Sequence, residues 1–156
     1  MKEESTEIVL EKILNSKSLE DVSKAMESTS AKFDKSFQDF FNEYLNENPE
    51  LKVAEIIKDS DIDKAYAYQM INGTKTSPGR DYVISLCYAS RMDLEDVNHA
   101  LIYTGNSPLH PKIKRDACII YAFKNNAKSK RVTTRELNET LCERNFELLK
   151  PVKGSR

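Results

Sequence analysis

The chain has 156 residues, which is enough for one compact domain with a hydrophobic core, or for one domain with extensions. Its hydrophobic content of 39% and charged content of 31% are typical of a globular protein and exclude a disordered one. With only four Gly and five Pro and no evenly spaced turn signals, the sequence excludes a β-sandwich and predicts an all-α fold.

The sequence shows no membrane span, no signal peptide and no zinc-type cysteine pattern. No apolar stretch approaches a membrane span, and the chain opens on an acidic segment without a signal-peptide core, so we expect a cytoplasmic protein with no membrane partner. Cys87, Cys118 and Cys142 are widely spaced and form no zinc-type Cys/His pattern. We interpret them as small apolar residues on buried faces, and we expect no metal and no cofactor.

Charge is divided unevenly along the chain. Residues 1–60 carry 8 Lys or Arg and 14 Asp or Glu, whereas residues 61–156 carry 16 and 11. The second half therefore has the sign needed to face a polyanion, although its excess is smaller than that of a strong nucleic-acid binder.

Residues 1–36 form an acidic N-terminal segment with two helical patterns. Apolar residues recur at helical spacing over residues 6–14, and a second helix is predicted from Ser18, with Asp21 as its capping acid. The predicted hairpin is either a packing element or an interaction arm.

Residues 37–105 show the pattern of five helices with apolar faces. The first runs from Phe37 to Asn48-Pro49, where proline disfavours helical geometry in the residue before it. The others are predicted over Val53–Asp59, behind the capping Asp63 to Asn72-Gly73, over Arg80–Arg91, and from Asp93 to Gly105.

Residues 106–156 read as a C-terminal extension of two helices. Lys112–Asn125 contains a run that is apolar all round, so we expect this helix to be buried on most sides. Thr133 and Glu136 have the spacing of a capping box before the last helix.

Two short helices separated by about three residues, the second ending at a glycine, have the spacing of a helix-turn-helix. The first helix of such a motif supports the second, whose N-terminal side chains reach base edges in the major groove. The predicted reading helix spans Asp63–Asn72. The residues expected to lock the two helices together are Ile56, Ile57, Ile62, Ala67 and Met70.

At these positions the sequence resembles the lambda-repressor-like family, also called the xenobiotic-response-element type. Ile56-Ile57, Ile62, Asp63 and Asn72-Gly73-Thr74-Lys75 stand at its motif positions. Ala65–Gly73, Arg80-Asp81 and Lys114–Ile120 are more narrowly similar to a group of uncharacterised regulators from Gram-positive bacteria, in which C-terminal helices accompany the DNA-binding-like domain. The resemblance implies a five-helix lambda-repressor-like domain over residues 37–105.

The resemblance also implies which residues would meet DNA. Base-reading positions are Lys64, Ala65 and Gln69, and glutamine can pair with adenine N6 and N7 together. Phosphate contacts would come from Asn72, Thr74, Lys75 and Thr76, with Arg80 at the start of the next helix. Tyr66 and Tyr68 flank the reading helix; either would contact DNA, bind a protein, or cover the core edge.

Several positions depart from the family pattern. Val53 replaces the usual phosphate-anchoring polar residue, and Asp61 stands where the turn usually has glycine. Glu55, Asp59, Asp61 and Asp63 bring acidic charge beside the expected DNA face, where it repels phosphate.

No catalytic motif is found, and His99 and His110 stand alone, so we do not expect an enzyme. The most basic segment runs from Lys112 to Arg131; it is a solvated face, a nucleic-acid contact, or a partner of the acidic N-terminal hairpin. The favoured function is a sequence-specific DNA-binding transcriptional regulator, a homodimer whose C-terminal helices dimerise or sense. The alternative is a protein-interaction adaptor that has lost DNA binding and uses Tyr66, Tyr68 or the N-terminal segment.

Overall fold

A computed structural model describes residues 35–126 and 130–149, and these residues are all helical or irregular, with no strand among them. The chain divides into two compact units, Met1–Lys35 and Ser36–Arg156. Every described residue except Lys35 lies in the second unit, which is the subject below. The predicted N-terminal hairpin lies outside the described residues.

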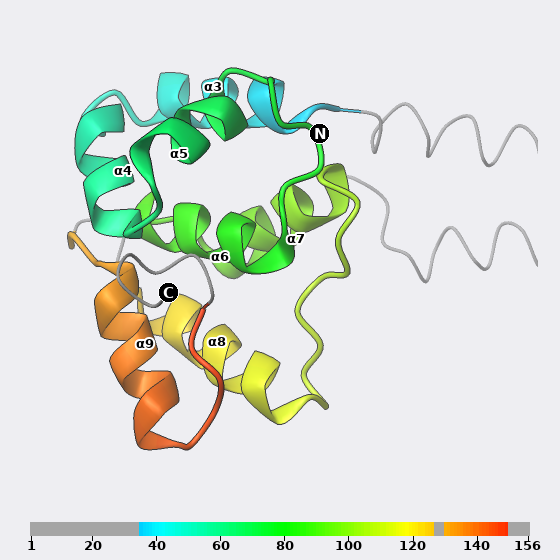
Figure 1. Cartoon of the computed structure of the whole chain (residues 1–156), viewed down its shortest axis with the longest axis vertical. Helices are drawn as coiled ribbons and strands as arrows, with labels where there is room; N and C mark the ends of the chain where they lie inside the picture. Colours follow the sequence, from blue (N-terminus) through cyan, green and yellow to red (C-terminus); the bar gives the residue numbers. More distant parts are fainter. Residues whose placement is uncertain (1–34, 127–129, 150–156) are drawn as a thin grey trace, which may run out of the picture. The chain divides into compact units, whose positions relative to one another are not determined.

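The described helices confirm an all-α fold and follow the predicted order (Figure 1). Their bounds differ from the predicted ones by no more than about one half-turn. They are α3 (Phe37–Glu47), α4 (Val53–Ser60), α5 (Lys64–Ile71), α6 (Arg80–Ala89), α7 (Leu94–Tyr103), α8 (Lys114–Asn125) and α9 (Thr134–Glu143).

Side-chain caps fix where several helices begin. The first backbone N–H groups of a helix have no partner within it, and an oxygen at the N-cap accepts from them. The Asp63 carboxylate accepts from the N–H of Tyr66 at 3.3 Å, as predicted. Thr133 likewise accepts from the N–H of Glu136. Asp93 and Asp96 form a reciprocal capping box at α7.

Left-handed backbone ends the two helices of the motif. Asp61, at the end of α4, has a φ of 60°, and Gly73, after α5, has a φ of 83°. Asp tolerates this conformation better than most residues do, so the turn forms without a glycine at this position. A Cβ at Gly73 would lie 2.5 Å from Gln38 Oε1, so the Gln38 side chain would have to move to admit it.

The inner residues of the motif pack as predicted. Each of the five predicted locking residues is at most 5% exposed, and Ala67 and Met70 are fully buried. Apolar burial therefore holds α5 against α4 and α3, with which it is in contact.

Helix α6 lies at the centre of the second unit. All eight residues from 83 to 90 are buried, whereas the sequence predicted one inward face. The difference arises because α4, α7 and α9 all pack against α6. Two backbone carbonyls there accept side-chain hydrogen bonds: Tyr44 Oη donates to the Ser90 carbonyl at 2.7 Å, and Thr134 Oγ1 donates to that of Ser85. Burial raises the pKa of the Cys87 thiol, consistent with a structural role.

The C-terminal extension differs from expectation in two ways. Helix α8 buries one side through Asp116, Ile119 and Phe123, while Tyr121 is 62% exposed, so the prediction of burial on most sides was wrong. Cys142 is exposed and Cys118 half-buried, so only Cys87 matches the predicted buried cysteine. The extension also belongs to the same compact unit as α3–α7, since α9 contacts both α4 and α6.

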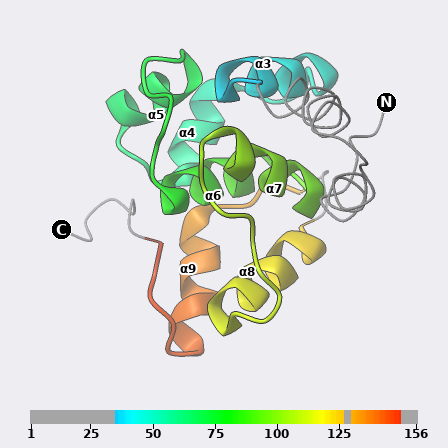
Figure 2. The same cartoon turned by 90° about the vertical axis from the view of Figure 1, so that its right-hand side faces the viewer.

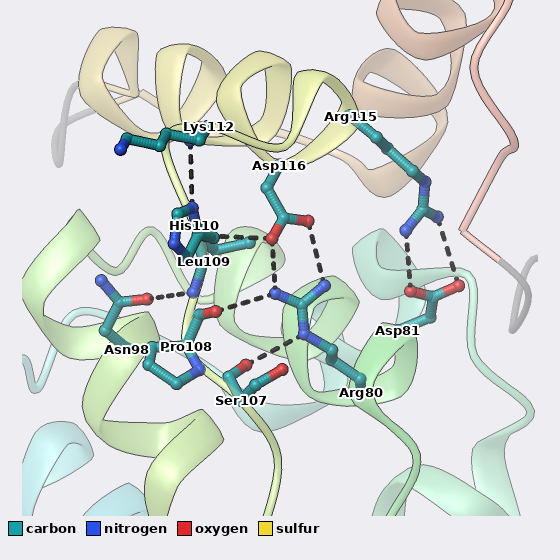
Figure 3. Close-up of polar contacts among 10 residues, drawn as sticks. All are labelled: Arg80, Asp81, Asn98, Ser107, Pro108, Leu109, His110, Lys112, Arg115 and Asp116. Atoms are coloured by element: carbon teal, nitrogen blue, oxygen red, sulfur yellow. Dashed lines mark hydrogen bonds and ion pairs between the residues drawn. The ribbon is translucent and has the colours of Figure 1, made fainter.

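An ion pair between Arg80 and Asp116 joins α6 to α8 (Figure 3). Two guanidinium nitrogens donate to the two carboxylate oxygens at 3.0 and 2.8 Å. The same guanidinium donates to the carbonyls of Ser107 and Pro108, and the Asp116 carboxylate also accepts from the N–H of His110. The group thus fixes the connector between α7 and α8 as well as both helices.

The Asp116 carboxyl is only 4% exposed, so its charge depends on these donors. Burial alone raises the pKa of Asp116. The hydrogen bonds from Arg80 and from the N–H of His110, with the charges of Arg80 and Arg115, outweigh burial and hold the pKa below its usual value. Beside this pair, Arg115 donates to Asp81 and to the carbonyls of Glu147 and Leu148.

We expect Arg80→Ala to lower the free energy of unfolding at pH 7 by about 2–4 kcal/mol, because it leaves a buried carboxylate without its cation. The lowered pKa of Asp116 means that this stabilisation is complete above the unfolded value of about 4 and is lost as pH falls through the folded value. Denaturant unfolding measured from pH 7 to pH 3 should therefore show the difference in unfolding free energy between wild type and variant decreasing as the pH falls. Arg144→Ala, at the exposed end of α9, is the control; an equal loss there would contradict the assignment.

Candidate nucleic-acid interface

Helix α5 presents a narrow outward stripe. Lys64, Ala65 and Tyr68 are exposed and Gln69 is half-buried, while Ala67 and Met70 face the core. These outward positions follow helical spacing, so the stripe runs along one side of the first two turns. In Figure 2, α5 lies at the edge of the helix group. The three predicted base-reading residues therefore lie together.

The loop after α5 is polar and locally ordered. Asn72 Oδ1 accepts from the N–H of Thr74 at 2.9 Å, and the Lys75 N–H donates to the Gln69 carbonyl at 2.9 Å. The side chains of Asn72, Thr74 and Thr76 are exposed. The predicted phosphate-contacting residues of this loop thus adjoin the C-terminal end of the stripe.

The two tyrosines of α5 have different surroundings. Tyr66 is half-buried and stacks on Tyr82 of α6, with ring centroids 4.0 Å apart, and Lys75 Nζ lies 4.8 Å from the Tyr66 ring centroid. Tyr66 therefore covers the core edge and holds the Lys75 ammonium by a cation–π contact. Tyr68 is 39% exposed and remains on the outward stripe.

Arg80 does not join the other predicted DNA contacts. Its side chain is 24% exposed, and the guanidinium already donates to Asp116, Ser107 and Pro108. Because these hydrogen bonds connect α6 to α8 and to the segment before it, Arg80 is not part of the candidate interface. The sequence suggested a phosphate contact because Arg80 opens a helix after the polar loop, and its partner in α8 is distant along the chain.

The acidic charge of α4 is partly neutralised by the extension. Arg131 Nε and Nη2 donate to the two oxygens of Asp59 at 2.7 and 2.9 Å, and Arg131 Nη1 lies 4.0 Å from Glu55 Oε1. Hydrogen bonding to Asp59, followed by its charge, raises the pKa of Arg131. The basic segment therefore contacts α4 through Arg131. Its predicted contact with the N-terminal hairpin lies outside the described residues.

A cationic hollow beside α5 was not foreseen from the sequence. Its volume is about 420 Å³, and Lys58 of α4, Lys64 of α5 and Arg135 of α9 all line it. Arg135 is far from the motif in sequence, and only the packing of α9 against α4 brings it there. We call this feature the cationic hollow.

The described part of the chain contains neither a candidate metal site nor a helix that could span a membrane. Its His, Cys, Asp and Glu residues form no group of three or more that could hold a metal ion. His110 Nδ1 accepts from the N–H of Lys112, which is a structural role. Within residues 35–126 and 130–149, every helix falls short of the length and apolarity that crossing a bilayer requires.

Comparison of the chain with models of protein families, with curated proteins and with solved structures found no match in any of the three. Any functional conclusion therefore has to rest on the residues and their geometry.

We expect Arg131→Ala to lower the melting temperature, because Asp59 is 7% exposed and loses its cation. Asp59→Asn in the Arg131→Ala background should recover part of the loss, since a neutral amide needs no counterion. Thermal unfolding of the single and double variants measures this coupling. Lys130→Ala, which removes the neighbouring exposed cation, is the control. Additive effects of the two changes would refute a coupled pair.

Proposed function

We propose that the chain is a sequence-specific DNA-binding transcriptional regulator of the lambda-repressor-like type, with α3–α7 as its DNA-binding domain. The observation that carries this proposal is the α4–turn–α5 unit. Its inner residues are buried, while Lys64, Ala65 and Gln69 lie together on the outer side of α5. A helix of this kind reads base edges with its N-terminal side chains.

Each group of side chains has a distinct role in the proposed complex. Gln69 pairs with an adenine through its amide, and Lys64 donates to a guanine or a phosphate. Asn72, Thr74, Lys75 and Thr76 contact the phosphate backbone at the far end of α5 and fix its register. The Arg131–Asp59 pair supports this arrangement, because it reduces the acidic charge that would repel phosphate.

We further propose that the regulator is a homodimer and that α8 contributes to the contact between copies. Ile113, at the N-cap of this helix, and Tyr121, about two turns further on, are 54% and 62% exposed. Two reading helices then meet half-sites about one helical turn of DNA apart, so binding sites selected from random DNA should be inverted repeats.

Gln69→Ala should cost about 1–3 kcal/mol of binding to a selected site and relax the preference at one base pair, because a bidentate amide contact is lost. Lys75→Ala should instead weaken binding to all sequences alike, because a phosphate contact carries no base information. Fluorescence anisotropy with selected and scrambled duplexes measures both effects.

The matched control for these variants is Arg144→Ala, which removes an exposed cation at the end of α9. It should leave the affinity for the selected site unchanged. If neither Gln69→Ala nor Lys75→Ala altered binding, the assignment of α5 as the reading helix would be wrong.

A protein-interaction adaptor is the second candidate, and the exposed Tyr68 favours it. Tyrosine is enriched at protein interfaces, and Tyr68 stands at the middle of the outward stripe. Glu55, at 47% side-chain exposure, and Asp63 also keep acidic charge near α5. A partner for this face would be a protein whose contact centres on Tyr68.

Salt dependence separates the two candidates. Binding to DNA should weaken about 10²-fold between 50 and 200 mM salt as counterions are released, and Tyr68→Ala should change it little. A tyrosine-centred protein contact should be nearly insensitive to salt and should fail with Tyr68→Ala. Affinities of wild type and variant, measured at both salt concentrations with the selected DNA, test the DNA proposal. Failure to enrich any sequence at 50 mM salt would favour the adaptor.

A further inference from the structure

The cationic hollow lies where three helices meet. Helix α9 packs against α4, and α4 packs against α5, so the start of α9 adjoins the turn of the helix-turn-helix (Figure 1). Its apolar side is formed by the exposed Ala54 and by the ring of Tyr68, which is 39% exposed, above the buried Ile57 and Ile62. The hollow is therefore built on the same core that holds the motif together.

The charged side of the hollow is unusual in having cations without counterions. In the part of the chain that the structure describes, Lys58, Lys64 and Arg135 form no ion pair or side-chain hydrogen bond. Elsewhere in the same unit, Arg80, Arg115 and Arg131 are all paired with carboxylates. Three unpaired cations around one concavity favour an anionic ligand.

Asp61 is the single acidic residue that lines the hollow, so the lining carries three positive groups and one negative group. Its Oδ2 is buried and has no hydrogen-bond partner within the described part of the chain. Asp61 forms no ion pair with any of the three cations, so it lowers the positive charge of the hollow without cancelling it.

The size and the mixed lining indicate the class of ligand. A volume of about 420 Å³ falls in the range of small-molecule sites, which combine apolar walls with a few placed polar groups. A phosphate ion alone would leave the accessible apolar surface of Ala54 and Tyr68 uncovered. An anion with an apolar body uses both sides of the hollow.

We propose that the cationic hollow binds a small organic anion with an apolar body, such as an aromatic carboxylate. The carboxylate accepts from Lys58, Lys64 and Arg135, and the ring packs on Ala54 and Tyr68. Lys64 and Tyr68 also belong to the outward stripe of α5, so the occupied hollow competes with DNA. Only this last consequence rests on the proposed function.

The test uses 1-naphthoate as the probe and its neutral amide, 1-naphthamide, as the matched ligand. Titration of the ¹⁵N-labelled full chain, without DNA, should shift the amide signals of residues 58, 62, 64, 68 and 135. The amide should bind at least about tenfold more weakly, because it cannot form the charge-assisted hydrogen bonds. Inorganic phosphate is titrated separately and should produce little shift.

Variants of the lining make the test specific. Arg135→Gln and Lys58→Gln should each weaken 1-naphthoate binding about three- to tenfold, because each removes one cation from a half-open site. Arg144→Gln, at the other end of α9, should leave the affinity unchanged. Asp61→Asn should tighten binding, since asparagine keeps the left-handed turn and removes the negative charge.

The proposal is overturned if 1-naphthoate shifts no signals of the lining, or if naphthoate and naphthamide bind equally. It is also overturned if Arg144→Gln weakens binding as much as Arg135→Gln, or if inorganic phosphate shifts the same signals as strongly as naphthoate. The last result would mark the hollow as a site for phosphate oxygens, such as those of a nucleic acid.

Competition with DNA is measured separately, by anisotropy with the selected duplex. Release of DNA by 1-naphthoate, reduced in Arg135→Gln, supports the consequence drawn for Lys64 and Tyr68. Probe binding to a chain that binds no DNA would sustain the ligand site while refuting the proposed function. DNA binding without probe binding would refute the ligand site and leave the proposed function standing.

Discussion

The bidentate contact between Arg80 and Asp116 is the interaction on which the rest of the second unit depends. It joins the first residue of α6 to the first turn of α8, and it also holds the connector between α7 and α8 through Ser107, Pro108 and His110 (Figure 3). A buried carboxylate has to be paired, so this contact admits few other arrangements of α8. The extension is therefore fixed to the motif domain instead of being tethered to it.

Helix α9 lies against α4 and α6, so basic residues in α9 and in the segment before it reach α4 and α5. Arg131 pairs with Asp59 on the supporting helix, and Arg135 lines the hollow beside Lys64. The extension thus changes the electrostatics of the motif in two places. It reduces the acidic charge of α4, and it adds a cation next to the proposed reading helix. Both effects connect the extension to the proposed regulation of DNA binding.

The candidate interface itself combines predictable and unpredictable parts. Lys64, Ala65 and Gln69 lie together as the helical spacing of α5 requires, and Asn72 and Thr74 follow in the ordered loop. Tyr66, by contrast, stacks on Tyr82, and Arg80 forms an ion pair with Asp116, so we do not count either among the residues that would contact DNA. Spacing identifies which residues share a face of one helix. Spacing does not predict whether a side chain at the edge of that face contacts a residue of a neighbouring helix instead.

The sequence by itself determined the local structure: the all-α class, the helix bounds, the caps at Asp63 and Thr133, the left-handed glycine after α5, and the inner residues of the motif. These features depend on side chains within a few residues of one another, so short-range periodicity and capping rules are sufficient. The tertiary structure decided the burial of α6 on all sides, the exposure of Tyr121, the pairing of Arg131 with Asp59, and the cationic hollow. Each of these depends on which helices pack together. Helices form their backbone hydrogen bonds internally, so backbone hydrogen bonding does not determine which helices are neighbours. It is set by side-chain packing and by a few buried charges whose partners are far apart in the sequence.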